Sequence, residues 1–236
     1  MQRSRAERSF SLALCLFAVV LALHVFLQSS FFRLEHLVIE GTDDLSAGDF
    51  LALTGVEYGQ NLYDMNLPEL EERVKELPFV LSVHIQRRLP GSLKVSVTER
   101  LPVAAVVAGG HFWLVDKEGH VIGPKAPTES FLVVTGPDIP SRLEPGEVID
   151  SPALRTAFTL AGELPAHLQL ELAEIQCAAG GGLYLLTRDG VMVRFGSLAQ
   201  SEEKCAVLYQ LLRHITANKE KPHLIDISNP AMPAVR

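Results

Sequence analysis

Three groups of residues in this chain are of types that can do chemistry. His111 and His120 flank a predicted hairpin, could approach each other and could together bind a metal ion. The run Gly180-Gly181-Gly182 could wrap a phosphate, and Cys177 with Cys205 could form a disulfide. Solvated histidines, a tight turn and two buried thiols are the simpler explanations. We favour them for the histidines and the glycines, whereas the pairing of the cysteines stays open.

The sequence patterns of common enzymes are missing. The sequence has no G-x-S-x-G nucleophile elbow, no P-loop and no H-E-x-x-H zinc motif. The net charge of −7 also argues against a generally basic protein that binds nucleic acid through phosphates. We therefore expect no catalytic, cofactor-binding or metal-binding residues, no nucleic-acid partner and no small-molecule substrate.

The first structural element indicated by the sequence is a long apolar segment at 10–32. As a helix this segment would be about 35 Å long, which is enough to cross a hydrocarbon core of about 30 Å. Arg3, Arg5 and Arg8 precede it, and an excess of arginine marks the cytoplasmic side of a membrane helix. We therefore predict a cytoplasmic tail at 1–9, a transmembrane helix at 10–32 and an extracytoplasmic remainder.

A cleaved signal peptide is the rival interpretation of this segment. Its apolar region would be shorter, about 7–15 residues, and would precede a site of small residues. Here the apolar run is longer, and the bulky Phe31 and Phe32 follow it. These features favour an uncleaved anchor.

Residues 33–100 show the order strand, helix, helix, strand, strand. The predicted strands are 36–40, 81–86 and 93–98, and the predicted helices run from the Ser46 cap to Thr54 and from 67 to 77. Glu71 and Lys75 lie four residues apart and are expected to pair on the exposed side of the second helix. Each strand has one apolar face that the helices can cover, so a β-α-α-β-β domain is predicted.

Residues 101–236 are mostly strand-like, with Asp116 and Gly119 in a hairpin turn. Leu168, Leu170 and Leu172 alternate as in a strand. The predicted helices are 151–164 and 198–216, and the predicted terminal strands are 223–227 and 234–236. The fold class is therefore α+β, with a single transmembrane helix, a β-α-α-β-β domain at 33–100 and a mixed β-rich domain at 101–236 that has a C-terminal helix and terminal strands.

Several short motifs occur in a characteristic order along nearly the whole chain. They are Ile39-Glu40-Gly41, Gly59-Gln60-Asn61-Leu62, Leu77-Pro78-Phe79-Val80, Arg88-Leu89-Pro90-Gly91-Ser92-Leu93, Thr98-Glu99-Arg100-Leu101-Pro102-Val103-Ala104, Leu114-Val115-Asp116 with Gly119, and Gly196 with Glu203-Lys204. This ordered set resembles the FtsQ/DivIB family of bacterial cell-division proteins. The resemblance identifies the first exported part as a POTRA module and the second as the family's β-domain.

The resemblance implies a non-enzymatic scaffold of the divisome. Such a protein would sit in the cell inner (plasma) membrane at the division septum, with its domains on the periplasmic side. It would bind single-pass division proteins of the FtsB/FtsL (DivIC) type and other divisome membrane proteins. A POTRA-bearing secretion or outer-membrane assembly component is the alternative, but repeated POTRA modules and a long barrel would not fit in 236 residues.

The expected partner site is the C-terminal edge of the sheet. An edge strand exposes unpaired N–H and C=O groups, so that a partner strand can be added there. The expected partner-binding residues are Leu224, Ile225, Asp226, Ile227, Ser228, Asn229, Ala234 and Val235. Ser228 and Asn229 replace the basic and aromatic residues usual in the family, and replacing Ile227 with proline is expected to weaken partner capture by removing a ladder donor.

Overall fold

The computed structural model of the protein describes residues 5–125, 131–218 and 222–236. The chain divides into two compact units, Met1–Glu99 and Arg100–Arg236. Each unit has its own hydrophobic core.

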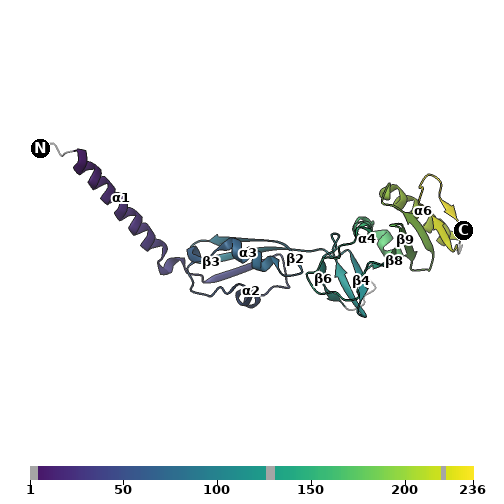
Figure 1. The fold of residues 1–236 in the computed structure, drawn as a ribbon, viewed down its shortest axis with the longest axis horizontal. Coiled ribbons are helices and arrows are strands. Elements are labelled where there is room, and N and C mark those ends of the chain that lie inside the picture. The colour runs from purple at the N-terminus through teal and green to yellow at the C-terminus, as the bar shows by residue number, and fades with distance from the viewer. Residues whose placement is uncertain (1–4, 126–130, 219–221) are drawn as a thin grey trace. The chain divides into compact units, whose positions relative to one another are not determined.

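The first unit begins with the helix α1, Arg5–Leu27 (Figure 1). Its stretch Phe10–Leu27 is long and apolar enough to cross a membrane. The helix ends five residues before the predicted end of the segment 10–32, and Ser30–Phe32 form a 3-10 turn, η1. The chain leaves the helix here because the Asn61 Nδ2 donates to the Leu27 carbonyl at 2.7 Å and Phe32 is buried.

The rest of the first unit has the predicted order of elements. They are β1 His36–Glu40, α2 Ala47–Thr54, η2 Leu62–Asp64, α3 Leu67–Lys75, β2 Val80–Arg88 and β3 Ser92–Glu99. The sheet order is β1-β3-β2, with β1 parallel and β2 antiparallel to β3. Phe50 and Val74 from the two helices and Leu93 and Val95 from β3 are fully buried in one core. The predicted β-α-α-β-β domain is confirmed.

Glu71 does not pair with Lys75 as predicted. Its Oε1 accepts the Ile85 backbone N–H at 2.7 Å and lies 3.1 Å from the His84 Nδ1, whereas the Lys75 Nζ lies 4.0 Å from the Glu72 carboxylate. A partly buried N–H on a strand edge costs more when unpaired than an exposed ion pair contributes. Glu71 therefore occupies part of the outer edge of β2.

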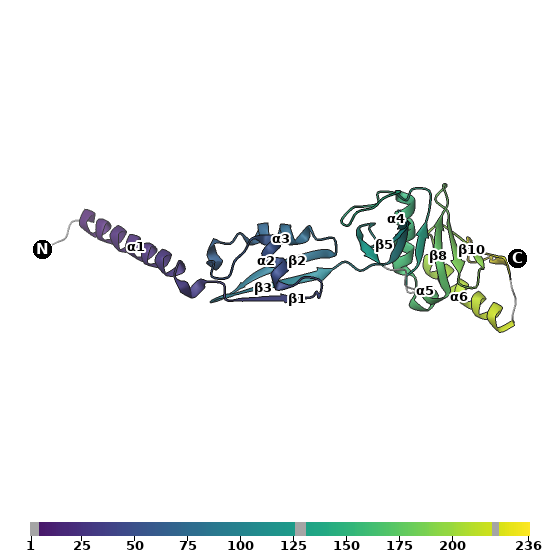
Figure 2. The ribbon, with the colours of Figure 1, turned by 90° about the horizontal axis from the view of Figure 1, so that it is seen from below.

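The second unit is built on one long mixed sheet (Figures 1 and 2). Its strands are β4 Ala104–Ala108, β5 His111–Val115, β6 Val121–Lys125, β7 Val133–Thr135, β8 Leu172–Cys177, β9 Leu183–Thr187, β10 Met192–Gly196, β11 Leu224–Asp226 and β12 Ala234–Val235. The helices are α4 Pro152–Glu163, α5 Ala166–Glu171 and α6 Ser201–Asn218. Their buried side chains share one core with the inward residues of the strands. The sheet order is β12-β11-β10-β9-β8-β7-β4-β5-β6.

The alternation of Leu168, Leu170 and Leu172 does not form a strand. Residues 166–171 are the helix α5, in which Leu168 is buried and Leu170 is 73% exposed, and β8 starts only at Leu172. The Pro165 carbonyl accepts the N–H groups of Leu168 and Gln169 and so closes the helical turn. Three alternating positions are too few to separate a strand from a single helical turn.

Candidate partner-binding site

The C-terminal strand β12 lies at the end of the sheet order and pairs antiparallel with β11. The Arg236 N–H donates to the Leu224 carbonyl at 2.9 Å, and the Leu224 N–H donates to the Arg236 carbonyl at 3.1 Å. In an antiparallel pair the backbone groups of successive residues point to opposite sides. The N–H and C=O of Val235 therefore point away from β11, and no strand of the described residues pairs with them.

Pro233 lies two residues before Val235 and so faces the same open side. Proline has no N–H, so it offers only its carbonyl to a neighbour. Proline on the outer side of an edge strand also limits uncontrolled pairing between sheets. The open edge of β12 thus presents one backbone donor, at Val235, beside the carbonyls of Val235 and Pro233.

The structure separates the predicted site residues into two groups. Ala234 and Val235 form the outermost strand, whereas Leu224, Ile225 and Asp226 form β11, which pairs on both sides. The Ile227 N–H donates to the Arg194 carbonyl at 2.9 Å, and the Ile227 side chain is fully buried. The expectation that Ile227 supplies a donor to a partner is therefore wrong, because this donor is used within the sheet.

Ser228 and Asn229 shape the turn that returns the chain to β12. The Ser228 N–H and hydroxyl donate to the Asp226 Oδ1 at 3.0 and 2.6 Å, and the Asn229 Oδ1 accepts the Ala231 N–H at 3.2 Å. The two bonds from Ser228, with the nearby Arg194 guanidinium, lower the pKa of the Asp226 carboxyl from its usual value. These polar residues thus stabilise the turn that lets β12 pair antiparallel with β11.

Beside the edge lies a sheet face whose side chains alternate with the buried core residues and are partly exposed. The register aligns Leu186 on β9 with Met192 on β10 and Leu224 on β11 in an apolar row. The adjacent row is polar and consists of Tyr184, Arg194 and Asp226, with the Arg194 guanidinium 3.4 Å from the Asp226 carboxylate. We call these six residues the open face.

Sequence reasoning missed the four members of the open face on β9 and β10, which are Tyr184, Leu186, Met192 and Arg194. The alternation Leu183, Leu185 and Val191, Val193 marks the buried side of each strand. The positions that alternate with these buried residues could therefore have been assigned to the other face. Which strands lie beside β11 could not be deduced, because that depends on the sheet order.

The two histidines considered as metal ligands lie in different surroundings. The His111 Nδ1 is 3.1 Å from the Gly109 carbonyl. His120 lies with Asp116 and Glu118, whose ligand atoms are within 4.8 Å of one another. The Arg100 guanidinium donates to the Asp116 Oδ2 at 2.8 Å, so a metal ion would have to displace a buried ion pair.

Asp116 organises the hairpin turn. Its Oδ1 accepts the N–H groups of Glu118 and His120, both at 2.9 Å, and its side chain is almost fully buried. Burial alone would raise the pKa of Asp116, but the hydrogen bonds from the His120 and Glu118 N–H groups and from Arg100 outweigh it and lower the pKa. The structure thus favours the charged form of this carboxyl.

Replacing Asp116 with asparagine should lower the free energy of unfolding of the second unit by about 2–3 kcal/mol at pH 7. Asparagine keeps an oxygen for the two turn N–H groups but loses the charge that pairs with Arg100. Because the folded pKa of Asp116 is lowered, its contribution is full above the unfolded pKa and is lost as the pH falls through the folded value. Unfolding curves of both proteins between pH 7 and pH 2 should therefore converge at the acid end, and a constant gap would contradict this account.

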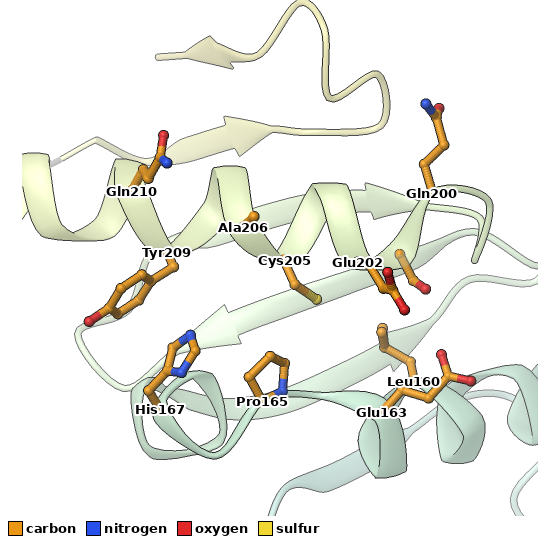
Figure 3. Close-up of a pocket in the computed structure, with 11 residues that line it drawn as sticks. Leu160, Glu163, Pro165, His167, Gln200, Glu202, Cys205, Ala206, Tyr209 and Gln210 are labelled. Atoms are coloured by element: carbon orange, nitrogen blue, oxygen red, sulfur yellow. The ribbon is translucent and has the colours of Figure 1, made fainter.

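The other two candidate groups have structural roles. Gly181 and Gly182 close the β8–β9 turn through bonds of 2.9 Å with Ala178, as predicted. Cys177 and Cys205 are free and buried, and burial raises the pKa of each thiol to about 11. Cys205 lines a hollow of about 790 Å³ between α6 and the α4–α5 region, beside Pro165 and Tyr209 (Figure 3).

Comparison with known protein families finds a match in each of the two units. The family model described as "POTRA domain, FtsQ-type" matches residues 32–100. The family model described as "Cell division protein FtsQ/DivIB, C-terminal" matches residues 104–228. The cell division protein FtsQ of Myxococcus fulvus is 31% identical over 216 residues, which cover 88% of this chain and 73% of that protein. The cell division protein FtsQ of Streptomyces griseus is 31% identical over 211 residues, which cover 88% of this chain and 98% of that protein.

Proposed function

Because the chain belongs to the FtsQ/DivIB family of cell division proteins, we propose that it is a non-enzymatic divisome scaffold that binds its partners at the C-terminal sheet edge. The partners are single-pass division proteins of the FtsB/FtsL (DivIC) type, together with other membrane proteins of the divisome. The family assignment supports this proposal over the alternative of a POTRA-bearing secretion component, since the FtsQ/DivIB C-terminal family model covers more than half of the chain.

The observation that carries the proposal is the outward-facing backbone of Val235 on β12. A partner strand placed there extends the sheet and forms backbone hydrogen bonds, each contributing about 0.5–1.5 kcal/mol net. This mode of binding needs no active site and no cofactor. A scaffold that works by holding other proteins together requires nothing more.

The open face supplies specificity to this edge. A strand added to β12 continues the sheet, so the partner's remaining residues can pack over Leu224, Met192 and Leu186. Apolar burial contributes roughly 25 cal/mol per Å², so a few such contacts match the contribution of the backbone bonds. The Arg194–Asp226 pair, with Arg194 half exposed, offers one cation and one anion to polar groups of the partner.

Replacing Leu186 with glutamate should weaken capture of the FtsB/DivIC-type partner by about tenfold, because a charge would be desolvated in the contact. The matched control is Leu170→Glu, which changes an exposed leucine of the same unit on the helix α5. Affinity of the purified full chain for the partner's extracytoplasmic segment can be measured by calorimetry. Equal affinities of the two variants for the partner would show that the open face is not part of the binding site.

The proposed topology follows from α1 and the charges around it. Residues 1–9 would form the cytoplasmic tail, the apolar part of α1 would cross the inner membrane, and both units would lie on the outer side. A fluorescent fusion of the full chain tests the divisome role in dividing cells. The proposal expects a band at mid-cell, whereas a uniform ring around the envelope would overturn it.

A further inference from the structure

The segment that connects α1 to the first sheet is held on both sides by the folded unit. The Leu34 N–H donates to the Gln60 carbonyl at 2.9 Å, and the Gly59 N–H donates to the Leu34 carbonyl at 2.9 Å. On the other side, the Glu35 N–H donates to the Gly91 carbonyl at 2.8 Å. The connection is therefore not a free linker, and the loops around Gly59 and Gly91 lie beside the first residues after the helix.

Aromatic rings join the end of α1 to the same loops. The Phe32 ring lies 5.2 Å from the Phe26 ring and 5.2 Å from the Tyr63 ring, measured between centroids. Arg87 fixes the turn that carries Tyr63, because its guanidinium donates to the Leu62 and Met65 carbonyls at 2.7 and 2.6 Å. With the Asn61 bond to Leu27, these contacts tie the end of the helix to the body of the unit.

The surface around this junction exposes large apolar and aromatic side chains. Phe31 is 60% exposed, Leu89 is 55%, Tyr58 is 54% and Tyr63 is 41%. We call these four residues the collar. They come from the junction itself, from the loops around Gly59 and η2, and from the β2–β3 turn, so residues far apart in sequence gather at one end of the unit.

The position of the collar identifies what covers it. The apolar part of α1 ends at Leu27, and 18 residues of helix span about 27 Å, close to the thickness of a hydrocarbon core. The residues that follow Leu27 therefore lie at the level of the lipid headgroups, where aromatic rings are enriched on membrane proteins. We propose that the collar is a second membrane contact, in which Phe31, Tyr58, Tyr63 and Leu89 enter the phospholipid interface on the outer side.

The charges beside the collar show which lipid chemistry it takes. Among the described residues, the exposed guanidinium groups of Arg33 and Arg88 form no ion pair, so they are available for lipid phosphates. The exposed carboxylates of Glu35, Glu57 and Asp64 lie in the same segments and offset this positive charge. The contact therefore depends on the apolar and aromatic side chains and on phosphate binding, and not on a net negative charge of the membrane.

The test places one tryptophan in the full chain and measures its quenching by lipid. In a Trp113→Phe background, the probe is Leu89→Trp in the collar, one residue after β2 ends, and the matched control is Leu81→Trp, an exposed leucine near the start of β2. Eight residues of strand separate the two positions by about 26 Å. The protein is reconstituted in nanodiscs of phosphatidylcholine whose upper acyl chains carry bromine, with unbrominated nanodiscs as the reference.

The proposal expects Leu89→Trp to lose about half of its emission and Leu81→Trp to lose almost none. Adding phosphatidylglycerol should leave this difference unchanged. Equal quenching of the two positions, or quenching of Leu89→Trp only in the presence of phosphatidylglycerol, would overturn the proposal. Replacing Tyr58 with serine should reduce the quenching of Leu89→Trp about twofold, whereas Val38→Ser on β1 should not change it.

This inference rests on α1 crossing the membrane, so a third probe tests that step separately. Phe17→Trp lies in the middle of the apolar stretch of α1, so it is measured in nanodiscs whose lipids carry bromine near the ends of the acyl chains. Quenching of Phe17→Trp without quenching of Leu89→Trp would contradict the collar and leave the anchor intact. An unquenched Phe17→Trp would contradict the anchor itself and the collar with it.

Discussion

Replacing Val235 with proline should weaken capture of the proposed FtsB/DivIC-type partner by about 30-fold, because the change removes the one donor of the open edge and leaves a partner carbonyl unpaired. The N–H of Val235 points away from β11, so its loss breaks no bond within the sheet. The bond from the Arg236 N–H to the Leu224 carbonyl stays in place. Calorimetric titration of the full chain with the partner's extracytoplasmic segment measures the effect.

Val235→Ala is the matched control, since it shortens the side chain and keeps the N–H. It should bind the partner within about threefold of the parent if the backbone carries the affinity. Amide exchange of β10 and β11 should be the same in both variants, which shows that the sheet is intact. Unchanged capture by Val235→Pro with an intact sheet would place the partner elsewhere.

Replacing Gly41 with alanine should destabilise the first unit by about 4 kcal/mol or more. Gly41 has a φ of +89°, which costs other residues about 1–2 kcal/mol. A Cβ at this position would also lie 2.0 Å from the backbone carbonyl oxygen of Val97 on β3. The backbone carbonyl cannot move aside without breaking the sheet, so the second cost adds to the first.

The same substitution at Gly59 measures the cost of a positive φ without the cost of a steric clash. Its φ is +87°, close to that of Gly41, but a Cβ there would meet no atom within 4 Å. Gly59→Ala should therefore cost only about 1–2 kcal/mol. Native-state amide exchange of the most protected residues of β3 measures both values in the full chain, and equal losses would show that the close approach to Val97 is unimportant.

The sequence allowed the elements of both units to be predicted because their patterns are local. The helix α2 begins where the Ser46 hydroxyl accepts the Asp49 N–H and ends at Gly55, as its capping residues predicted. The β2 and β3 strands show a clear alternation around Pro90-Gly91. Such signals depend on neighbours in the chain, so they can be recognised without knowledge of the fold.

The candidate site could be located only in part, because its geometry depends on contacts between distant segments. The two terminal strands are both short, and nothing in their composition shows that β11 takes the inner position by pairing in parallel with β10. The burial of Ile227 and the use of its N–H by Arg194 follow from that pairing. The end of α1 at Leu27 likewise depends on Asn61, which lies 34 residues away.

Amide hydrogen exchange at Val235 tests the central claim most directly. In the free full chain this N–H faces the open edge and should exchange within the fastest class of amides. If a partner strand is added to β12, saturating amounts of the FtsB/DivIC-type segment should slow the exchange of Val235 by about 100-fold or more, while Ile227 stays protected in both states. Binding of the partner with unchanged exchange at Val235 would contradict the claim that this protein works by offering its edge strand.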